Sequence, residues 1–289
     1  MVGTVTSASH PSACAGALAL LDEEFIFSRG RALSFSVRFA AALAQPDSRM
    51  LLVRSGERIG AALLLRPFDW ITPERRWRAA MVGLVWTRRD LRGRGIGLAL
   101  LREAEALMRE SGIEFAVLWS TRSAFYARAG WLAADCGMLG HWTGGDAGAA
   151  ASAPARELWP AIHALRESLG GERVARDLSA YGALLPPATE RDAFVEHGAY
   201  ALIGRRDATG YVFEIGGAAQ GLPAIWAAMS GRYREIFINV RRDGSAHAWL
   251  SSLPAIAWQE QQLAMWLPLS AGFDAAQFGR WYLPFLDRI

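Results

Sequence analysis

The sequence predicts an α/β protein with mixed sheets that carry helices on both faces. Apolar runs with the length and β-branched content of strands alternate with amphipathic helical segments, and a glycine-rich turn joins a strand to a helix between Leu84 and Leu101. The second half of the chain repeats the order of helix, paired strands, helix and strand. We therefore expect a structural duplication, although no repeat is visible residue by residue.

The length favours two domains, because 289 residues exceed the usual size of roughly 100–200 residues per domain. With 52% hydrophobic and 20% charged residues, the composition is that of a packed globular protein. The stretch from Thr143 to Ala155 is rich in small residues and has no periodic apolar pattern. We place a linker at residues 146–157, between domains at residues 1–145 and 158–289.

Apolar periodicity gives the expected elements of each half. In the first half we expect helices at residues 13–21, 32–43, 96–109 and 123–128, and strands at 50–54, 58–66, 77–86, 115–120 and 131–139. In the second half we expect helices at residues 156–169, 189–197 and 222–230, strands at 200–205, 211–215, 235–241 and 263–269, an amphipathic piece at 246–253 and a helical C-terminal piece.

The composition excludes several kinds of chemistry. All 31 basic residues are arginine, so the chain has no lysine for a Walker A loop, a pyridoxal Schiff base or a kinase strand. The arginines are scattered, and we expect no nucleic-acid partner. Two cysteines, Cys14 and Cys136, are too few for a disulfide framework or a cysteine zinc site. We expect no metal, a reducing compartment, no signal peptide, no membrane span and a cytoplasmic protein.

The strand, turn and helix between Leu84 and Leu101 form the strongest motif. A tight turn of alternate glycines lets backbone amides converge on an anion, and the helix that follows adds the positive end of its dipole. A Rossmann fingerprint would need glycine where Leu98 stands. A turn that binds nothing is the alternative, but two flanking arginines favour a pyrophosphate. The residues of this loop are Arg92, Gly93, Arg94, Gly95, Ile96 and Gly97.

Two motifs resemble the GCN5-related N-acetyltransferase (GNAT) superfamily. Arg92-Gly-Arg-Gly95-Ile-Gly97 is similar to its acyl-CoA loop, Arg/Gln-x-x-Gly-x-Gly/Ala. Phe125-Tyr126-Ala-Arg-Ala-Gly130-Trp131 resembles its Phe-Tyr-x-basic-x-Gly-aromatic element after the fifth strand. The pair of motifs covers residues 79–135 and is more specific than either motif alone.

The resemblance implies acetyl-CoA as the acyl donor. The backbone of Leu84, Val85 and Trp86 would bind the pantetheine arm, and the amides of residues 92–97 would bind the pyrophosphate. Tyr126 would be the general acid that protonates the departing thiolate. The alternative for Tyr126 is a packing role on the last strand.

No general base can be assigned from the sequence. The family often uses a glutamate or a water chain near the fourth strand, but residues 78–85 hold no carboxylate. Other ionisable groups qualify by position only, and each is as well explained as a surface charge or a structural histidine. These groups are Glu23, Glu24, Asp69, Glu74 and His141.

The order of elements further resembles the tandem acetyltransferases of the enhanced intracellular survival type, in which a degenerate second domain follows a competent first one. The corresponding turn of the second half, Gly216 to Pro223, lacks the arginine and the alternate glycines. The second half would then bind no CoA and would wall the acceptor cleft. Proteins of that type use a chain-terminal carboxylate as base, a role that we do not transfer to Ile289.

We expect an N-acetyltransferase that moves acetyl from acetyl-CoA to an amine of a small molecule or a peptide, as a monomer or homodimer. Antibiotic, polyamine, amino-acid and peptide amines all remain open as acceptors. A CoA-binding sensor or scaffold without catalysis is one alternative, and a partner-binding module that holds no CoA is another. Turnover separates the first alternative from the enzyme, and titration with acetyl-CoA separates the second.

Overall fold

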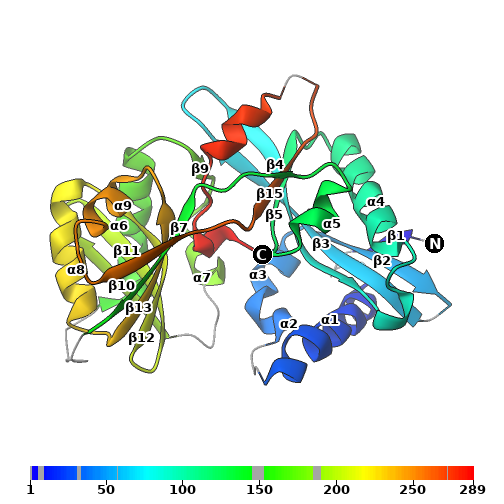
Figure 1. Ribbon diagram of the computed structural model, residues 1–289, viewed down its shortest axis with the longest axis horizontal. Coiled ribbons are helices and arrows are strands. Elements are labelled where there is room, and N and C mark those ends of the chain that lie inside the picture. Colours follow the sequence, from blue (N-terminus) through cyan, green and yellow to red (C-terminus); the bar gives the residue numbers. More distant parts are fainter. Residues whose placement is uncertain are drawn as a thin grey trace.

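The computed structural model describes residues 2–5, 10–30, 34–56, 58–144, 153–184, 190–271 and 273–289. These residues form two mixed sheets that lie side by side, each with helices packed on its faces (Figure 1). The predicted α/β class is therefore confirmed. The N-terminus lies at the outer edge of the first sheet, whereas the C-terminus lies between the two halves.

The first sheet has the order β1-β2-β3-β4-β5-β15-β6, with β9 paired to β3. All its neighbouring strands are antiparallel except β4 and β5. Its strands are β1 (Val2–Val5), β2 (Arg49–Ser55), β3 (Arg58–Ile71), β4 (Arg76–Thr87), β5 (Phe115–Trp119), β6 (Leu132–Ala133), β9 (Arg173–Val174) and β15 (Ala264–Pro268).

Helices cover both faces of this sheet because the strands present apolar side chains on both sides. The helix α4 packs Leu100, Ala104 and Met108 on one face, and α1 packs Ala17 and Leu21 on the other. The helical elements of this half are α1 (Pro11–Phe25), η1 (Phe27–Arg29), α2 (Phe35–Arg38), α3 (Ala40–Ala44), η2 (Arg89–Leu91), α4 (Ile96–Glu110) and α5 (Ser123–Ala127).

The second sheet repeats this plan with the order β14-β7-β13-β12-β11-β10-β8. Here β12 and β13 form the parallel pair, and α8 and α6 pack on opposite faces. Its strands are β7 (Gly137–Thr143), β8 (Ala153–Pro154), β10 (Glu190–Glu196), β11 (Ala199–Arg206), β12 (Thr209–Gly217), β13 (Glu235–Arg241) and β14 (Ile256–Glu260). The helical elements of the second half of the chain are α6 (Ala155–Ser168), α7 (Ala180–Leu184), η3 (Ala219–Gly221), α8 (Leu222–Ser230), α9 (Ser245–Leu250), η4 (Ala275–Gly279) and η5 (Phe285–Asp287). Of these, η4 packs on the first sheet, where Phe278 contacts Phe115 and Trp266.

The two halves exchange a strand. β7 leaves the first half and lies between β13 and β14, and β15 leaves the second half and lies between β5 and β6. The carboxylate of Asp135 holds the crossing point, because it accepts hydrogen bonds from the main-chain N–H groups of Gly137, Leu263 and Ala264 at 2.8, 3.0 and 2.9 Å. Each sheet is thus completed by the other half of the chain.

This exchange corrects one expected strand and changes how the chain divides. The single strand expected at residues 131–139 is wrong, because β6 and β7 belong to different sheets. The exchanged strands lie on both sides of the expected linker, so the sheets do not separate at one point of the chain. Much of that linker, residues 145–152, lies outside the described residues. The domain ranges stay a prediction.

Three expected helices also differ. The helix expected at residues 189–197 is strand β10, whose Phe194 and Val195 pair with Ala201 and Tyr200 of β11 and override the local helical pattern. The helix expected at residues 32–43 is two short helices, α2 and α3, and its first residues lie outside the described ones. The C-terminal helical piece is two 3-10 turns, η4 and η5.

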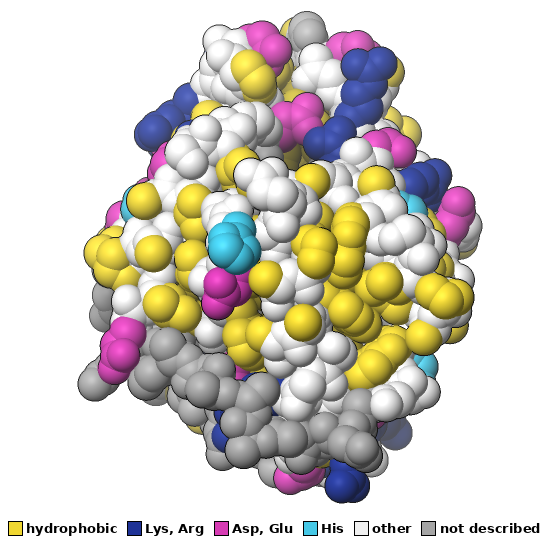
Figure 2. Space-filling view, turned by 90° about the vertical axis from the view of Figure 1, so that its left-hand side faces the viewer, with side chains coloured by type: hydrophobic (Ala, Val, Ile, Leu, Met, Phe, Trp, Pro, Cys, Tyr) yellow, Lys and Arg dark blue, Asp and Glu magenta, His cyan; other side chains and the backbone are white. Residues whose placement is uncertain are grey.

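The surface adds two observations. Figure 2 shows the end of the molecule that the second half forms. The described arginines lie toward the upper and lower edges of this face, and hydrophobic side chains are spread among polar ones between those edges. Basic side chains are thus not gathered over the centre of this face. In the described ranges, none of the helices is both long and apolar enough to cross a membrane.

Candidate active site

The centre of the candidate site is a splayed pair of parallel strands. β4 and β5 pair from Ala79 and Phe115 to Met81 and Val117. Beyond these pairs, both strands line a pocket of about 790 Å³, which we call the cleft. An extended ligand arm fits such an opening, because strand edges offer backbone N–H and C=O groups as partners.

A bulge in β4 sets the direction of these backbone groups. The pairing of β3 with β4 shifts register between Ala62 and Leu64. Opposite this shift, Leu84 has a φ of 54°, a left-handed conformation that is costly for a branched residue. The predicted pantetheine-binding residues begin at this bulge, and all three of them line the cleft: Leu84, Val85 and Trp86.

The predicted pyrophosphate loop lies at the carboxyl end of β4. Gly93 and Gly95 have φ values of 77° and 78°, which only glycine adopts at little cost. Gly95 is the N-cap of α4 and its place leaves the first-turn amides without a side-chain cap. A helix N-terminus of this kind attracts anions. Gly93, Gly95, Ile96 and Gly97 line the cleft, and Arg94 does not.

Gly97 is needed for close packing and not for an unusual conformation. A Cβ at this residue would lie 3.1 Å from Cζ of Phe125 and 3.2 Å from Oγ1 of Thr87. Those distances are shorter than ordinary van der Waals contact, so the first turn of α4 approaches α5 only with glycine here. The two motifs of the sequence thus meet at this contact.

Arg92 differs from the expectation that its guanidinium faces phosphate. Its Nη2 donates to Oε1 of Glu24 at 2.5 Å and its Nε donates to the Thr87 carbonyl at 2.9 Å. Glu24 also accepts from Nε1 of Trp86 at 3.1 Å and from Nε of Arg89 at 3.4 Å. Burial acts to raise the pKa of Glu24, but these hydrogen bonds outweigh it and lower that pKa. Glu24 therefore braces the loop against α1.

Tyr126, the predicted general acid, lies on α5 and lines the cleft. The side chain is 8% exposed and packs edge-on against Phe125 and Trp131. Burial raises the pKa of Tyr126, and a hydrogen bond with Ser120 only partly opposes this shift. The phenol is therefore protonated at neutral pH and can donate a proton. Its packing role and a catalytic role are compatible.

The groups considered as a base lie in different places. Glu24 lines the cleft but is held by three donors, while Glu23, Asp69 and Glu74 do not line it. His141 lies on β7 of the second sheet, where Nε2 is 2.8 Å from Glu235.

Ile289 also lines the cleft, and no motif in the sequence places it there. Its Cγ1, carbonyl carbon and oxygen lie 3.1, 3.2 and 3.2 Å from the position of a Cβ at Gly83. Gly83 immediately precedes the bulge, so Ile289 sits beside the point where β4 changes direction. No local pattern in the sequence could signal a contact between residues so far apart in the chain.

The end of the cleft near Ile289 is aromatic and basic. Phe25, Phe35 and Phe39 form a row with ring centroids 6.4 and 5.7 Å apart. The Arg29 guanidinium lies 5.5 Å from the ring centroid of Phe25 and also lines the cleft. Phe39 and Ile289 also line a second, smaller cavity, so this row of rings extends to the Ile289 end of the cleft.

The corresponding turn of the second half is filled by protein. A Cβ at Gly221 would lie 2.4 Å from the Glu196 carbonyl oxygen, and one at Gly217 would lie 2.4 Å from Cα of Ala199. The N–H of Ala218 donates to the Gly198 carbonyl at 2.8 Å. These glycines therefore allow the turn to pack closely on the β10–β11 hairpin.

Among the described residues, no three His, Cys, Asp or Glu side chains are grouped so that they could hold a metal ion. Cys14 and Cys136 are both buried free thiols.

Comparison with known proteins gives a family match for the first half of the chain. Residues 10–134 match the family model described as acetyltransferase (GNAT) domain. This match covers less than half of the chain, and the fold of the described residues is that of a tandem GNAT protein. A comparison with curated proteins gives no match.

Solved structures of low identity share this fold. A GCN5-related N-acetyltransferase from Kribbella flavida is 16% identical with a TM-score of 0.67, over 92% of this chain and 70% of that one. Eis1 from Mycobacterium abscessus is 15% identical with a TM-score of 0.61, over 93% and 74%. A tandem GNAT protein from the clavulanic acid biosynthesis pathway is 15% identical with a TM-score of 0.56, over 94% and 100%.

Proposed function

We propose that the protein transfers an acetyl group from acetyl-CoA to an amine of a small molecule or peptide. One observation carries the proposal: the strand opening, the glycine loop and the Tyr126 side chain all line one cleft. The family match supports an acetyltransferase, and the cleft supports the donor and the residues proposed below.

The donor would lie along β4. Its pantetheine arm would pair with the backbone of Leu84, Val85 and Trp86 where β5 has turned away. The pyrophosphate would accept hydrogen bonds from the amides between Arg92 and Gly97 and gain from the dipole of α4. In this arrangement the thioester would lie near the bulge and the Ile289 end of the cleft.

The reaction proceeds by direct attack. The amine nitrogen forms a bond to the thioester carbonyl carbon, and the bond from that carbon to sulfur breaks as the tetrahedral intermediate collapses. Tyr126 gives its phenolic proton to the departing sulfur, and the amine nitrogen loses a proton to solvent or to a base that is not assigned. Solvent then returns a proton to Tyr126. The products are an amide and free CoA.

Titration with acetyl-CoA, followed by an assay of thiol release, tests the proposal. We expect saturable binding to the wild type and its loss in Gly95→Glu, because that change places a carboxylate in the phosphate loop at a positive φ. Gly279→Ala is the matched control, since a Cβ there has no atom within 4 Å. The absence of saturable binding, or equal binding by Gly95→Glu, would remove the basis of the proposal.

The second candidate function is a CoA-binding sensor or scaffold. One observation favours it. Among the described residues, Glu24 is the acidic side chain that lines the cleft, and it accepts hydrogen bonds from Arg92, Trp86 and Arg89. Those contacts leave it poorly suited to act as a base. Both functions predict binding of acetyl-CoA. Only the enzyme predicts thiol release that depends on an added amine.

A further inference from the structure

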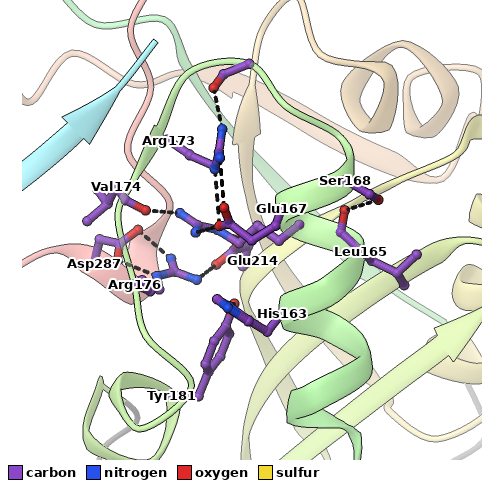
Figure 3. Close-up of polar contacts among 12 residues, drawn as sticks. His163, Leu165, Glu167, Ser168, Arg173, Val174, Arg176, Tyr181, Glu214 and Asp287 are labelled. Atoms are coloured by element: carbon purple, nitrogen blue, oxygen red, sulfur yellow. Dashed lines mark hydrogen bonds and ion pairs between the residues drawn. The ribbon is translucent and has the colours of Figure 1, made fainter. Parts of the chain in front are cut away.

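A cluster of buried charges connects the C-terminal segment to both halves of the molecule. Its centre is Asp287 in η5, a fully buried carboxylate. Nε of Arg176 donates to Oδ1 of Asp287 at 2.7 Å, and Nη2 of Arg176 donates to Oδ2. Figure 3 shows Arg176 lying between Asp287 and Glu214.

The cluster is fixed to the second half through Glu214 of β12. This carboxylate accepts from Nη1 of Arg176 at 2.5 Å and from the hydroxyl of Tyr200 at 2.8 Å. Nε of Arg166, on α6, lies 3.2 Å from its Oε1. The side chains of Arg166, Arg176 and Glu214 are 5%, 1% and 6% exposed, so bulk water does not screen these contacts.

The same segment is tied to the first half. Nη2 of Arg66, on β3, donates to the main-chain oxygen of Asp287 at 3.1 Å. Next along the chain, Arg288 donates from Nε to the Leu283 carbonyl at 3.0 Å, and its guanidinium carbon lies 5.0 Å from the ring centroid of Trp119 on β5. Both the side chain and the main chain of this segment are therefore held.

These contacts end at the cleft. Ile289 is two residues beyond Asp287, and its carbonyl group and side chain adjoin Gly83 before the β4 bulge. A two-residue connection leaves little freedom between Asp287 and the cleft, because each extended residue spans at most about 3.6 Å. A shift of Asp287 would move Ile289 by a similar distance.

The cluster is better explained by position than by stability. Burying an ion pair costs desolvation free energy that its attraction often only balances, and apolar residues of the same size commonly stabilise as well. Burial acts to raise the pKa of Asp287, but the charge and hydrogen bonds of Arg176 outweigh it and lower that pKa. The carboxylate therefore stays charged and fixes a directional, two-pronged contact.

We propose that Asp287 is a positioning residue for acetyl transfer: with Arg176 it anchors the C-terminal segment on the second half and so sets the place of Ile289 in the cleft of the first. The proposal rests on the proposed function. It makes the second half, which has no phosphate cradle of its own at Gly216 to Pro223, a structural part of the active site.

The test compares two buried carboxylates of the second half. Asp287→Asn removes the negative charge that Arg176 contacts and keeps the shape of the side chain. Asp192→Asn is the matched control, because Asp192 is also buried and accepts from Nε of Arg232 at 2.7 Å and from the hydroxyl of Tyr233, but it lies on β10 and not in the segment that leads to Ile289. For each variant, kcat, KM for acetyl-CoA and Tm are measured with a thiol-release assay.

We expect Asp287→Asn to lower kcat about 10- to 100-fold, as for a misplacement of about 1 Å, with KM for acetyl-CoA within about twofold of the wild type. Asp192→Asn should lower Tm and retain kcat. The kcat of Arg176→Lys should lie between the values of the wild type and of Asp287→Asn, because lysine keeps the positive charge and loses the two-pronged contact.

Ile289→Gly keeps the test decisive if Asp287→Asn does not fold. It leaves the cluster intact and removes the side chain beside Gly83, so the same fall in kcat is expected. Wild-type kcat in either Ile289→Gly or folded Asp287→Asn, or an equal loss in Asp192→Asn, overturns the positioning role while the proposed function stands. No turnover by the wild type overturns both.

Discussion

The guanidinium of Arg92 donates to the carboxylate of Glu24 at 2.5 Å, and this contact joins the phosphate loop to the C-terminal end of α1. Glu24 is only 16% exposed at its side chain, so the pair is partly protected from solvent and salt. The loop therefore has its position before any donor binds. In the proposed function, its backbone amides and not the Arg92 side chain would bind the pyrophosphate, because Glu24 already occupies that guanidinium.

The first prediction concerns acid stability. Because the folded state lowers the pKa of Glu24, its charged form stabilises the fold at pH values above the ordinary glutamate pKa of about 4.3, and this contribution is lost as the pH falls through the lower, folded pKa. Glu24→Gln lacks this dependence. Chemical denaturation at pH 7 and at pH 3 should show a smaller difference in unfolding free energy for Glu24→Gln than for the wild type.

Glu23→Gln is the control for that measurement, since Glu23 neighbours Glu24 and does not line the cleft. It should follow the wild-type pH dependence. A Glu24→Gln curve that runs parallel to the wild-type curve would contradict the contribution of this carboxylate.

The second prediction concerns the contact between the two motifs. Gly97→Ala should raise the Kd for acetyl-CoA about tenfold, because the added Cβ must push away Phe125 or Thr87 and so displace the first turn of α4. Isothermal titration measures this change, and circular dichroism confirms that the variant is folded. Gly279→Ala, where the Cβ enters open space, should bind as the wild type does.

Local signals made this part of the site predictable. Alternate glycines between an apolar run and an amphipathic helix indicate a phosphate loop, and the glycine conformations at residues 93 and 95 are the physical basis of that pattern. Tyr126 was placed in the same way, by a short motif on one helix. Glycines of the loop and Tyr126 line the cleft, and their roles stay predictions.

Contacts distant along the chain could not be predicted. The exchange of β7 and β15 depends on strand pairing between halves, and alternation of side chains says nothing about which sheet a strand will join. The helix expected at residues 189–197 is wrong because its local pattern does not show the pairing with β11, which makes this segment the strand β10. Glu24 and Ile289 carry no motif, and only the fold brings them to residues 92 and 83.

The third prediction concerns the proposed acid. Tyr126→Phe removes the hydroxyl and keeps the ring packed on Phe125 and Trp131, so the Kd for acetyl-CoA should be unchanged. The kcat should fall about 10²- to 10⁴-fold, which is the usual contribution of general acid catalysis. Tyr211→Phe, on β12 of the second sheet, should retain wild-type kcat. Equal kcat in Tyr126→Phe and the wild type would leave Tyr126 with a packing role alone.

The pH profile gives a separate test of Tyr126. Burial raises the pKa of its phenol above the ordinary tyrosine value of about 10, so the proton needed for the thiolate remains in place through neutral and mildly alkaline pH. The wild-type kcat should therefore not fall between pH 7 and about pH 9. A decline in that range that is absent in Tyr126→Phe would mean that this tyrosine ionises there, contrary to its buried setting.

The last prediction concerns the acceptor. The Ile289 end of the cleft presents three phenylalanine rings and Arg29, a combination that favours an amine carrying an apolar body and an anionic group over a polycation. Phenylalanine and phenylalanine amide differ in the carboxylate, so their kcat/KM ratio measures this preference. We expect the wild type to favour the carboxylate form and Arg29→Gln to reduce the ratio severalfold. Arg206→Gln, at the end of β11 and outside the cleft, should keep it, and a polyamine used better than both would show that Arg29 does not select the acceptor.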